Sequence, residues 1–414
     1  MKFAHLADCH IGSYRDERMR SLTIEAFKRA VEKSIEEKID FLLISGDLFN
    51  TSIPSIDAIR ETASQFKRLL DENIPVYMIA GSHDYSPSGK TMLDVLESSG
   101  LCKNIAKGEV TDDDRLKLAF TIDQKTGAKI TGMIGKRGTL ERSYYEKMDN
   151  TEIEEEKGFK IFMFHSAISE LKPKRLEKIE SAPMSYLPKG FNYYAGGHVH
   201  SIIKESSKEL GGVIAYPGPL FPNSFSELEE LGNGGFYIFD VMDPELLRYI
   251  PIKTKETKRV KIEATMKTPE EVISEVRESM EDVADKIILI RIFGKLGSGR
   301  VSDVKLGEVV KEAYDKGAYF VMRNTSSLTS EEFESISTST ESIFELEDDI
   351  IKKNIGQKKF NSIGMDKAKE EEVTKNLLEM LDVEKQEGET KSDFEERIKE
   401  NAGFLEKDII GDND

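Results

Sequence analysis

The sequence predicts an α/β protein, because short apolar runs alternate with amphipathic segments over the first 250 residues. Four runs are too short for independent helices and have the composition of buried strands. A second observation is that the segments between the first three runs have helical periodicity, with charges between the apolar positions. The four predicted strands cover residues 2–6, 41–45, 76–80 and 161–164.

Two helices are predicted between these strands. Ile24, Phe27, Val31 and Ile35 recur at three- and four-residue steps after the first strand. After the second strand the same spacing links Ile56, Ile59, Ala63, Phe66 and Leu70. This stripe packs either against the sheet or against a second subunit, and we favour the sheet because most such stripes are intramolecular.

Further strands and a domain boundary are predicted before residue 260. Runs at 213–216, 235–241 and 246–252 have Gly, Pro and Asp between them and indicate a second set of strands. The polar stretch 253–258 then ends the first domain, which we place at 1–252.

A smaller α/β domain is predicted at 258–325. Thr268 and Glu271 form a capping box with Pro269 at the first helical position. A strand at 286–293 follows, Ser302 is expected to cap a second helix, and 319–322 is expected to be the last strand.

The remaining residues, 326–414, form an acidic tail. Three short amphipathic stretches occur at 343–355, 373–381 and 394–405. The tail is either partly disordered or forms helices that order in a partner's hydrophobic groove, and we favour the second interpretation. The net charge is −18, and most of it lies in the tail. Residues 331–414 contain 25 acidic and 12 basic residues, whereas residues 1–330 contain 52 acidic and 47 basic residues. A nearly balanced body is compatible with a local anion site, particularly with bound metal ions.

Composition also bears on location. The two cysteines, Cys9 and Cys102, are too few for a disulfide framework and indicate a reducing compartment, so we expect a cytoplasmic, nucleoid-associated protein. The longest apolar run, near 287–293, is far shorter than the ~20 residues that cross a bilayer. We therefore expect neither a membrane span nor a signal peptide.

The most informative pattern is that acidic and histidine residues follow five separate predicted strands. Ligands bind at the carboxyl edge of the strands in open α/β sheets. Five of the six histidines belong to this set, and only His5 lies outside it. After the four strands given above come Asp8 and His10, Asp47, His83 and Asp84, and His165. The fifth strand is the run 193–195, and His198 and His200 follow it.

Carboxylate and imidazole ligands together suit divalent ions such as Mn²⁺, Fe²⁺ or Zn²⁺. A carboxylate between two histidine clusters is able to bridge two ions about 3.5–4 Å apart, an arrangement that promotes in-line displacement at phosphorus. The pattern therefore predicts a dinuclear phosphoesterase.

The motifs Asp8-x-His10, Gly46-Asp47, Gly81-x-His83-Asp84, His165 and Gly197-His198-x-His200 resemble the calcineurin-like metallophosphoesterase superfamily. They cover about the first 220 residues, and the resemblance implies a two-sheet sandwich flanked by helices. The small α/β domain and the helical C-terminal tail extend the resemblance to the nuclease subunit of the DNA double-strand-break repair complex, the meiotic recombination eleven family. The resemblance to this family implies that the small α/β domain is a capping domain that positions DNA. It also implies that the tail binds a partner, a coiled-coil ATPase.

The resemblance implies two Mn²⁺ ions per subunit. Asp8, His10 and His200 would hold one ion, His165 and His198 the other, and Asp47 would bridge them. His83 would act near the scissile phosphate, stabilising the transition state or protonating the leaving 3′ oxygen.

One position departs from the family pattern. Ser82 stands where the family has an Asn whose amide oxygen is a ligand of the second ion. A hydroxyl is a shorter and poorer ligand, so we expect weaker binding at that site. Asp84 either orients His83 or caps its loop, and we favour the cap. Cys9 is expected to be a small buried hydrophobe.

Candidate contacts to DNA and to the partner were chosen by composition and by position. Basic clusters near the predicted catalytic loops are the DNA candidates, and their contacts with the DNA backbone would give little sequence preference. They are Arg15, Arg18 and Arg20, then Lys136, Arg137 and Arg142, then Lys172, Lys174 and Arg175. The partner-binding candidates in the tail are Ile343, Leu346, Ile350, Ile351, Val373 and Leu377.

The resemblance implies a Mn²⁺-dependent DNA nuclease, a 3′-to-5′ exonuclease on double strands and an endonuclease on single strands. It also implies a homodimer through the phosphoesterase domain and a coiled-coil ATPase of the chromosome-maintenance type. Two alternatives remain at this point. One is a nuclease-weak repair scaffold that binds DNA ends, and the other is a phosphoesterase that acts on small phosphodiesters.

Overall fold

The computed structural model describes residues 1–86, 91–136, 142–173, 181–243, 245–330 and 367–381, together with Phe394 and Arg397. Met1–Glu331 form one compact unit and Glu332–Asp414 a second. Among the described helices, none is long and apolar enough to cross a membrane.

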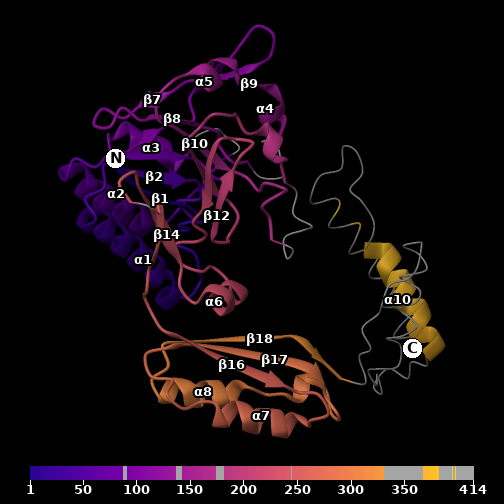
Figure 1. The fold of residues 1–414 in the computed structure, drawn as a ribbon. Coiled ribbons are helices and arrows are strands. Elements are labelled where there is room, and N and C mark those ends of the chain that lie inside the picture. The colour runs from indigo at the N-terminus through magenta and orange to yellow at the C-terminus, as the bar shows by residue number, and fades with distance from the viewer. Residues whose placement is uncertain are drawn as a thin grey trace. The chain divides into compact units, whose positions relative to one another are not determined.

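The first unit is built on two six-stranded sheets that face each other (Figure 1). In spatial order the first sheet is β15 (Leu247–Pro251), β14 (Gly235–Asp240), β1 (Lys2–Leu6), β2 (Phe41–Ser45), β3 (Val76–Ile79) and β4 (Lys103–Asn104). The second is β12 (Ile203–Ser207), β13 (Gly212–Tyr216), β11 (Tyr193–Gly197), β10 (Lys160–His165), β8 (Lys129–Gly132) and β7 (Thr121–Ile122).

Aromatic side chains fill the space between the two sheets. The ring of Phe3 stacks on Phe41 and Phe239, with centroids 5.0 and 4.8 Å apart. It also meets Tyr193 of the opposite sheet edge-on, at 5.1 Å. These residues are buried because β1 and β11 each turn one face toward the other sheet.

Helices and a small sheet cover the outer faces. The first sheet is covered by α1 (Glu17–Glu36), α2 (Ile56–Asp71) and α3 (Met92–Ser98). The second is covered by α4 (Arg142–Lys147), α5 (Thr151–Glu155) and the sheet of β5 (Gly108–Val110), β6 (Leu116–Leu118) and β9 (Met148–Asp149). The short 3-10 helix η3 (Met184–Tyr186) lies in the same layer.

The strand pairing brings one set of carboxyl ends together. β1, β2 and β3 are parallel neighbours, and so are β8, β10, β11 and β13. The runs predicted as a second set of strands divide between the sheets. β13 joins the second sheet, whereas β14 and β15 extend the first sheet as antiparallel strands beside β1.

The structure corrects the predicted packing of α2. Phe66 is fully buried, but Ile56 is 82% exposed and Leu70 is 46% exposed. The buried stripe is displaced around the helix and contains Ala58 and Leu69 instead. The favoured assignment of the whole stripe to the core was therefore wrong for its two ends.

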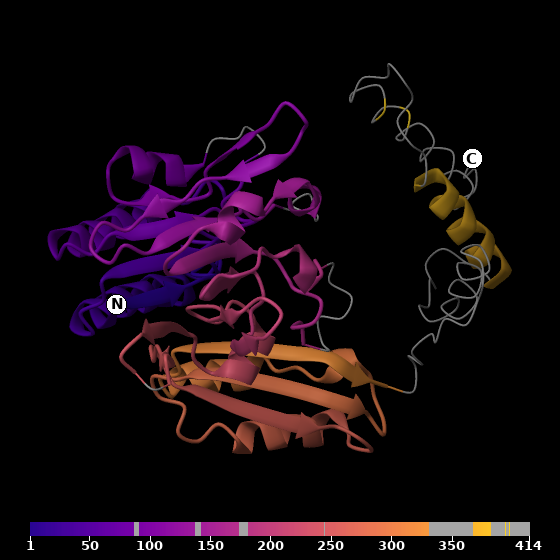
Figure 2. The same ribbon diagram turned by 45° about the horizontal axis from the view of Figure 1, so that its top comes forward.

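A three-stranded parallel sheet of β16 (Thr257–Glu263), β17 (Ile287–Lys295) and β18 (Phe320–Thr329) follows. One face is covered by α7 (Pro269–Glu278) and α8 (Gly307–Asp315), which lie below the strands in Figure 1. Figure 2 shows the three strands running side by side. The capping box of Thr268 and Glu271 is present, with Pro269 in the first turn.

The predicted cap at Ser302 was wrong. Ser302 lies inside the 3-10 helix η4 (Val301–Asp303), where the Asp303 carboxylate accepts a hydrogen bond from the Arg300 backbone N–H at 2.8 Å. α8 begins at Gly307 without a side-chain cap. An extra turn therefore separates the predicted cap from the helix.

The other face of this sheet packs against the larger domain. Ile287 and Leu289 of β17 belong to the same core as α1 and the first sheet. Arg18 of α1 donates to the backbone carbonyl oxygen of Tyr319 at 3.2 Å, and its guanidinium lies 5.1 Å from the ring centre of Phe320. The small domain is thus anchored to the larger one by apolar and polar contacts.

In the second unit the structure describes α10 (Lys367–Leu381). Val373 is half-buried and Leu377 is 43% exposed. The partner candidates Ile343, Leu346, Ile350 and Ile351 lie outside the described residues.

Candidate metal centre

The metal-ligand candidates meet at the shared carboxyl edge of the two sheets. Asp8 and His10 follow β1, Asp47 follows β2, and His83 follows β3. His165 ends β10, while His198 and His200 follow β11. Residues as far apart in the chain as Asp8 and His200 are therefore brought together, as the sequence predicted.

Three overlapping groups of three side chains have candidate ligand atoms within 4.8 Å of one another. Asp47 Oδ2 lies 3.2 Å from His165 Nε2 and 3.8 Å from His10 Nε2. Asp47 thus lies between the clusters, at the position expected of a bridging carboxylate. The three groups are Asp8, His10 and His200; His10, Asp47 and His83; and Asp8, Asp47 and His165.

Hydrogen bonds fix which nitrogen of the His165 and His83 rings faces the cluster. His165 Nδ1 lies 2.8 Å from the carbonyl oxygen of Ser45, and His83 Nδ1 lies 2.8 Å from that of Asn50. Because a carbonyl oxygen only accepts, both Nδ1 atoms must carry the proton. In the neutral ring, the Nε2 lone pair is then left for a metal ion.

The donor set fits divalent ions. His165 Nε2 is buried and makes no hydrogen bond, although the Asp47 carboxylate is near. His10 Nε2 and His200 Nε2 face each other at 3.1 Å, a contact that requires a proton or a cation when both present lone pairs. Oxygen and imidazole ligands without thiolate suit Mn²⁺, Fe²⁺ or Zn²⁺, so Mn²⁺ fits but is not singled out.

Electrostatics separate the histidines into two kinds. Burial lowers the pKa of His10 to about 4 against the opposing Asp47 charge, and burial with the neighbouring His165 lowers that of His198 to about 4. For His165, burial is outweighed by Asp47, which raises its pKa to about 9. Asp8 and Glu227 likewise outweigh burial and raise the pKa of His200 to about 10.

The same pairing acts on Asp47. Burial alone would raise the pKa of this carboxyl, but His165 and His10 outweigh burial and hold it well below its usual range. Asp47 is therefore an anion near neutral pH, the form that binds metal ions.

The backbone at the site adopts unusual conformations. Asp8, His10, Asp47 and His198 all have positive φ, at 49°, 42°, 50° and 87°. Such angles cost non-glycine residues of order 1–3 kcal/mol each and cluster at functional sites. Gly46 has φ of 85°, and a Cβ there would lie 2.2 Å from His165 Nδ1, so only glycine fits.

Other predicted site residues occupy the same region. Ser82 Oγ donates to Asp47 Oδ2 at 3.4 Å. His198 lies outside the three groups, but its ring centre is 5.2 Å from that of His165, and its backbone N–H donates to Asp8 at 3.0 Å. These contacts place both residues beside the cluster.

Asp84 and Cys9 have structural roles. The Asp84 carboxylate accepts hydrogen bonds from the backbone N–H groups of Leu48, Phe49 and Gly81 at 3.0–3.2 Å, so it caps the loop as favoured. Burial and the Asp47 charge raise its pKa to about 7. Cys9 is fully buried in the core, as predicted.

Sequence reasoning missed Glu227. This residue lies on α6 (Phe225–Leu231), and its Oε1 accepts from His200 Nδ1 at 3.1 Å. The signal in the sequence is Ser224-x-x-Glu227, which indicates only a helix start. Ser224 does cap α6, but the Glu227 carboxylate is turned toward the histidine.

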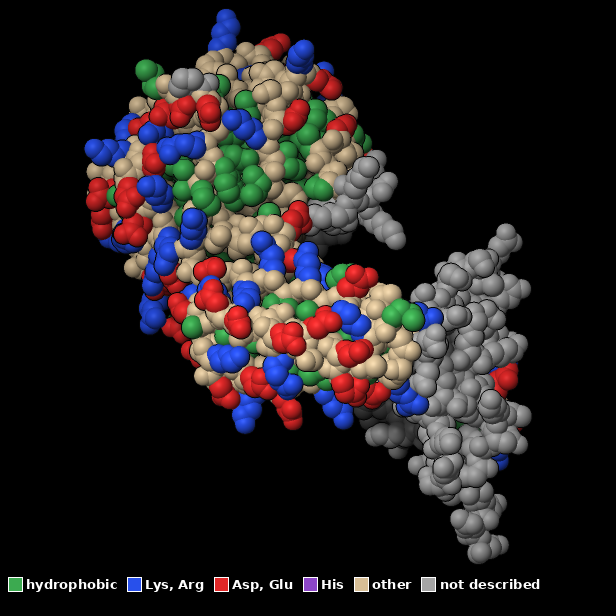
Figure 3. Space-filling view, turned by 60° about the horizontal axis from the view of Figure 1, so that its bottom comes forward, with side chains coloured by type: hydrophobic (Ala, Val, Ile, Leu, Met, Phe, Trp, Pro, Cys, Tyr) green, Lys and Arg blue, Asp and Glu red, His purple; other side chains and the backbone are tan. Residues whose placement is uncertain are grey.

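The DNA candidates differ in their surroundings. Arg15 is exposed beside the first motif, whereas Arg18 pairs with Asp16 at 3.2 Å and contacts the small domain. Lys172 is half-buried, and Lys174 and Arg175 lie outside the described residues. Figure 3 shows acidic and basic side chains intermingled on the small domain, without a uniformly basic area on the face in view.

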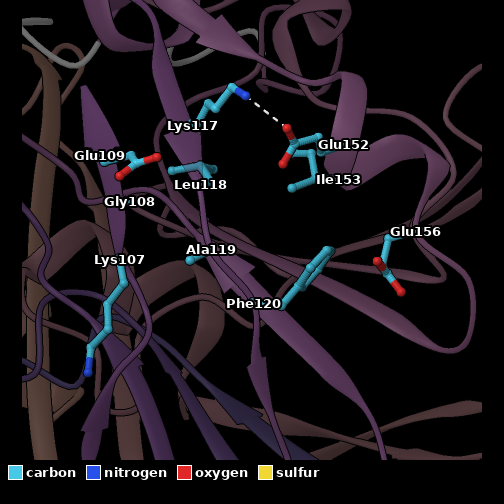
Figure 4. Close-up of a pocket in the computed structure, with 10 residues that line it drawn as sticks. All are labelled: Lys107, Gly108, Glu109, Lys117, Leu118, Ala119, Phe120, Glu152, Ile153 and Glu156. Carbon is cyan, nitrogen blue, oxygen red and sulfur yellow. Dashed lines mark hydrogen bonds and ion pairs between the residues drawn. The ribbon is translucent and has the colours of Figure 1, made fainter. Parts of the chain in front are cut away.

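A separate pocket of about 620 Å³ lies between the small sheet and α5. Lys117 and Glu152 form an ion pair of 2.8 Å at its wall, and the side chain of Phe120 lies below them in Figure 4. Basic and acidic residues both line it, and no candidate metal ligand does. It is therefore distinct from the metal centre.

The match to a protein-family model agrees with this geometry. The family model described as calcineurin-like phosphoesterase matches residues 1–201, which carry every candidate ligand. A dimetal phosphatase structure from Danio rerio aligns with a TM-score of 0.39 and 10% identity, over 57% of this chain and 91% of that one. The match to the family model and the candidate metal ligands define a metallophosphoesterase, the class of enzyme predicted from the sequence.

Three archaeal relatives are each named DNA double-strand break repair protein Mre11. The Archaeoglobus fulgidus protein is 28% identical over 64% of this chain and 62% of its own length. The Methanococcus maripaludis protein is 31% identical over 58% of this chain and 63% of its own length. The Methanocaldococcus jannaschii protein is 30% identical over 63% of this chain and 69% of its own length. The chain therefore belongs to the Mre11 family, and it spans 62–69% of the length of these three relatives. The predicted family is confirmed.

Proposed function

We propose that this protein is a Mn²⁺-dependent DNA nuclease of double-strand-break repair. Its activities would be 3′-to-5′ exonuclease on double strands and endonuclease on single strands. The observation that carries the proposal is that two carboxylates and four histidines meet at the shared carboxyl edge of the two sheets, in groups whose ligand atoms lie within 4.8 Å of one another. Three relatives named as double-strand-break repair proteins support DNA ends as the substrate.

Asp8, His10 and His200 would hold one ion, and His165, His198 and Ser82 would lie around the other, with Asp47 between them. Two bound Mn²⁺ ions would activate water and stabilise the charge that develops at phosphorus. The protein's own contribution is to hold Asp47 ionised and to point the Nε2 atoms of His165 and His200 inward.

His83 is the residue best arranged for proton transfer. Its Nδ1 proton is committed to the Asn50 carbonyl oxygen, so Nε2 is the atom that exchanges a proton. The ring centre lies 4.8 Å from that of His10, at the border of the cluster. Protonated Nε2 would donate its proton to the leaving 3′ oxygen, and the neutral His83 that results would take up a proton from solvent before the next turnover.

The test is release of nucleotides from end-labelled linear double-stranded DNA with Mn²⁺, and with Mg²⁺ as the metal control. We expect cleavage by the wild type and none by Asp47→Ala. Asp113→Ala, which removes an exposed carboxylate from a distant turn, serves as the matched control and should cleave normally.

The two alternatives give different results in the same assay. DNA binding without cleavage at any Mn²⁺ concentration, even with the ATPase and ATP, would indicate a repair scaffold. Cleavage of a chromogenic phosphodiester but not of long DNA would indicate an enzyme for small substrates.

We also propose a homodimer through the phosphoesterase domain. Ile56, the first residue of α2, is 82% exposed, Ile53 just before the helix is 86% exposed, and Leu70 near its end is 46% exposed. An apolar stripe of this kind on a helix is typical of a subunit contact. It corresponds to the second interpretation of the predicted stripe.

The remaining expected partners are DNA and the coiled-coil ATPase. Val373 and Leu377 of α10 supply apolar side chains for the ATPase, and Leu377→Asp should weaken capture of the full-length protein by that ATPase. Unchanged capture would exclude this helix.

A protein that acts on chromosomal DNA ends would work in the cytoplasm, at the nucleoid. For Arg15 and Lys172 as DNA contacts, replacement by Ala should weaken DNA binding and reduce its salt dependence.

A further inference from the structure

The short helix α6 lies between the metal centre and the small domain. Its carboxylates Glu227 and Glu229 are two positions apart, so the helical repeat directs them to opposite sides. Leu228 between them is fully buried in the main core. The helix is therefore anchored in the middle and contacts a different structure on each side.

The inner contact is with the metal ligand His200. Glu227 Oε1 accepts from His200 Nδ1 at 3.1 Å, and Glu227 Oε2 accepts from the Asn223 backbone N–H at 2.8 Å. Both carboxylate oxygens are thus engaged. Because a carboxylate only accepts, Nδ1 of His200 carries a proton and the opposite nitrogen faces Asp8, 3.6 Å away.

The outer contact is with the sheet of the small domain. Arg291 of β17 donates to both oxygens of Glu229, with Nε–Oε1 at 2.9 Å and Nη2–Oε2 at 2.7 Å. Lys261 of β16 lies 3.6 Å from the same carboxylate. The Arg291 guanidinium also lies 5.0 Å from the ring centre of Phe225, at the first turn of α6.

We propose that Glu227 is a positioning residue for His200, and that α6 transmits the position of the small domain to the metal centre through Glu229 and Arg291. A shift of the β16–β18 sheet would displace α6, and the Glu227–His200 hydrogen bond would move the imidazole with it. This rests on the proposed function only in that His200 binds a metal ion. The result would be a metal affinity that depends on where the small domain lies.

Three matched substitutions on α6 test this in the full chain. Each replaces one carboxylate by its amide: Glu227→Gln for the inner contact, Glu229→Gln for the outer contact, and Glu230→Gln as the control on the same helix. Glu227→Ala is added because the amide oxygen of Gln still accepts a hydrogen bond. Mn²⁺ binding is followed by titration calorimetry, with electron paramagnetic resonance of free Mn²⁺ as a second readout and no DNA present.

Glu227→Ala should weaken one of the two Mn²⁺ ions by about 10–100-fold, the usual effect of removing a group that orients a metal ligand. Glu227→Gln should have a smaller effect in the same direction. Glu229→Gln should weaken the same ion by at least about fivefold, the lower end of typical coupling between sites. Glu230→Gln should bind as the wild type does.

Wild-type affinity in Glu227→Ala, or in Glu229→Gln, would overturn the proposal when circular dichroism shows the variants folded. Equal weakening in Glu230→Gln would also overturn it, because the effect would then come from the helix charge alone. A wild type that binds two Mn²⁺ ions without cleaving DNA would contradict the proposed function. The calorimetry would still test the roles of Glu227 and Glu229 in that case. A wild type that binds no Mn²⁺ would contradict both.

Discussion

His83 donates a hydrogen bond from Nδ1 to the backbone carbonyl oxygen of Asn50 at 2.8 Å, which turns its Nε2 toward the metal centre. Replacing His83 by Gln removes the group that exchanges a proton while keeping a polar side chain of similar length. We expect cleavage of DNA by His83→Gln to fall by about 10²–10⁴-fold, the usual contribution of a general acid or base. Single-turnover cleavage at saturating Mn²⁺ measures this effect.

Mn²⁺ binding provides the control for His83→Gln. If His83 acts on the substrate and not on the metal, calorimetry should give the wild-type stoichiometry of Mn²⁺. Loss of an ion in this variant would assign His83 to the ligands instead.

Ser82 offers a second test, because its hydroxyl reaches Asp47 Oδ2 at 3.4 Å and is shorter than an amide. Ser82→Asn should lower the Mn²⁺ concentration for half-maximal cleavage by about tenfold, as is typical when groups around a metal are changed. Ser82→Ala, which removes the hydroxyl, should raise that concentration or leave it unchanged. A titration of Ser82→Asn that superimposes on the wild type would contradict the hypothesis of a weakened second site.

The sequence was sufficient to predict which side chains meet at the candidate metal centre, but not which residues lie behind them. Asp8, Asp47 and His165 were predictable because parallel strands bring their carboxyl ends to one edge whatever the details of packing. Glu227 was not, because its spacing from Ser224 matches an ordinary helix cap and only the fold brings it to His200.

The fold shows the same limit. The strands β1 and β2 lie where the apolar runs predicted them, since buried strands carry a local signal. The burial of α2 was misjudged at Ile56, because spacing gives the period of a helix but not which side meets the sheet. The partners of β14 and β15 also depended on long-range pairing.

The Glu229–Arg291 pair predicts a pH dependence of stability. Hydrogen bonds from Arg291 outweigh partial burial and hold the pKa of Glu229 below its usual range. A lowered folded-state pKa stabilises the protein above the unfolded value of about 4.3, and this contribution is lost as the pH falls through the folded value. Glu229→Gln should therefore cost about 1 kcal/mol at pH 7, and the difference should shrink below about pH 4.

Urea unfolding of Glu229→Gln beside the wild type, at several pH values, measures this difference. Glu230→Gln provides the baseline for removing one charge from α6. A destabilisation that grew on acidification would have the wrong sign for this ion pair.

Phe3 tests the core between the two sheets. Its ring is fully buried against Phe41, Phe239 and Tyr193. Phe3→Ala should lower the free energy of unfolding by about 3–5 kcal/mol, because it leaves a cavity between rigid sheets. Phe3→Leu should cost less than half of that in the same urea experiment. Equal effects of the two changes would mean that the core collapses around the smaller side chain.

Ile56 tests the proposed dimer. Ile56→Glu should leave the fold intact, because the position is exposed, but it should place a charge in the proposed subunit contact. The dimer dissociation constant in sedimentation velocity should rise about 30-fold, as for loss of a strong interface residue. Ile122→Glu, at an apolar position that is 48% exposed on β7, is the matched control. A wild type that sediments as a monomer would exclude the dimer.

The position of β1 in its sheet has a consequence for synthesis on the ribosome. β1 lies between β2 and β14, and Phe3 stacks on Phe239, which is made 236 residues later. At ~5–20 residues per second, the N-terminal strand waits roughly 10–50 s for this neighbour. During that interval one edge of β1 stays open to pairing with other nascent chains. Truncated products that end before β14 should therefore aggregate, and holdase chaperones that cover strand edges should raise the yield of the full-length protein.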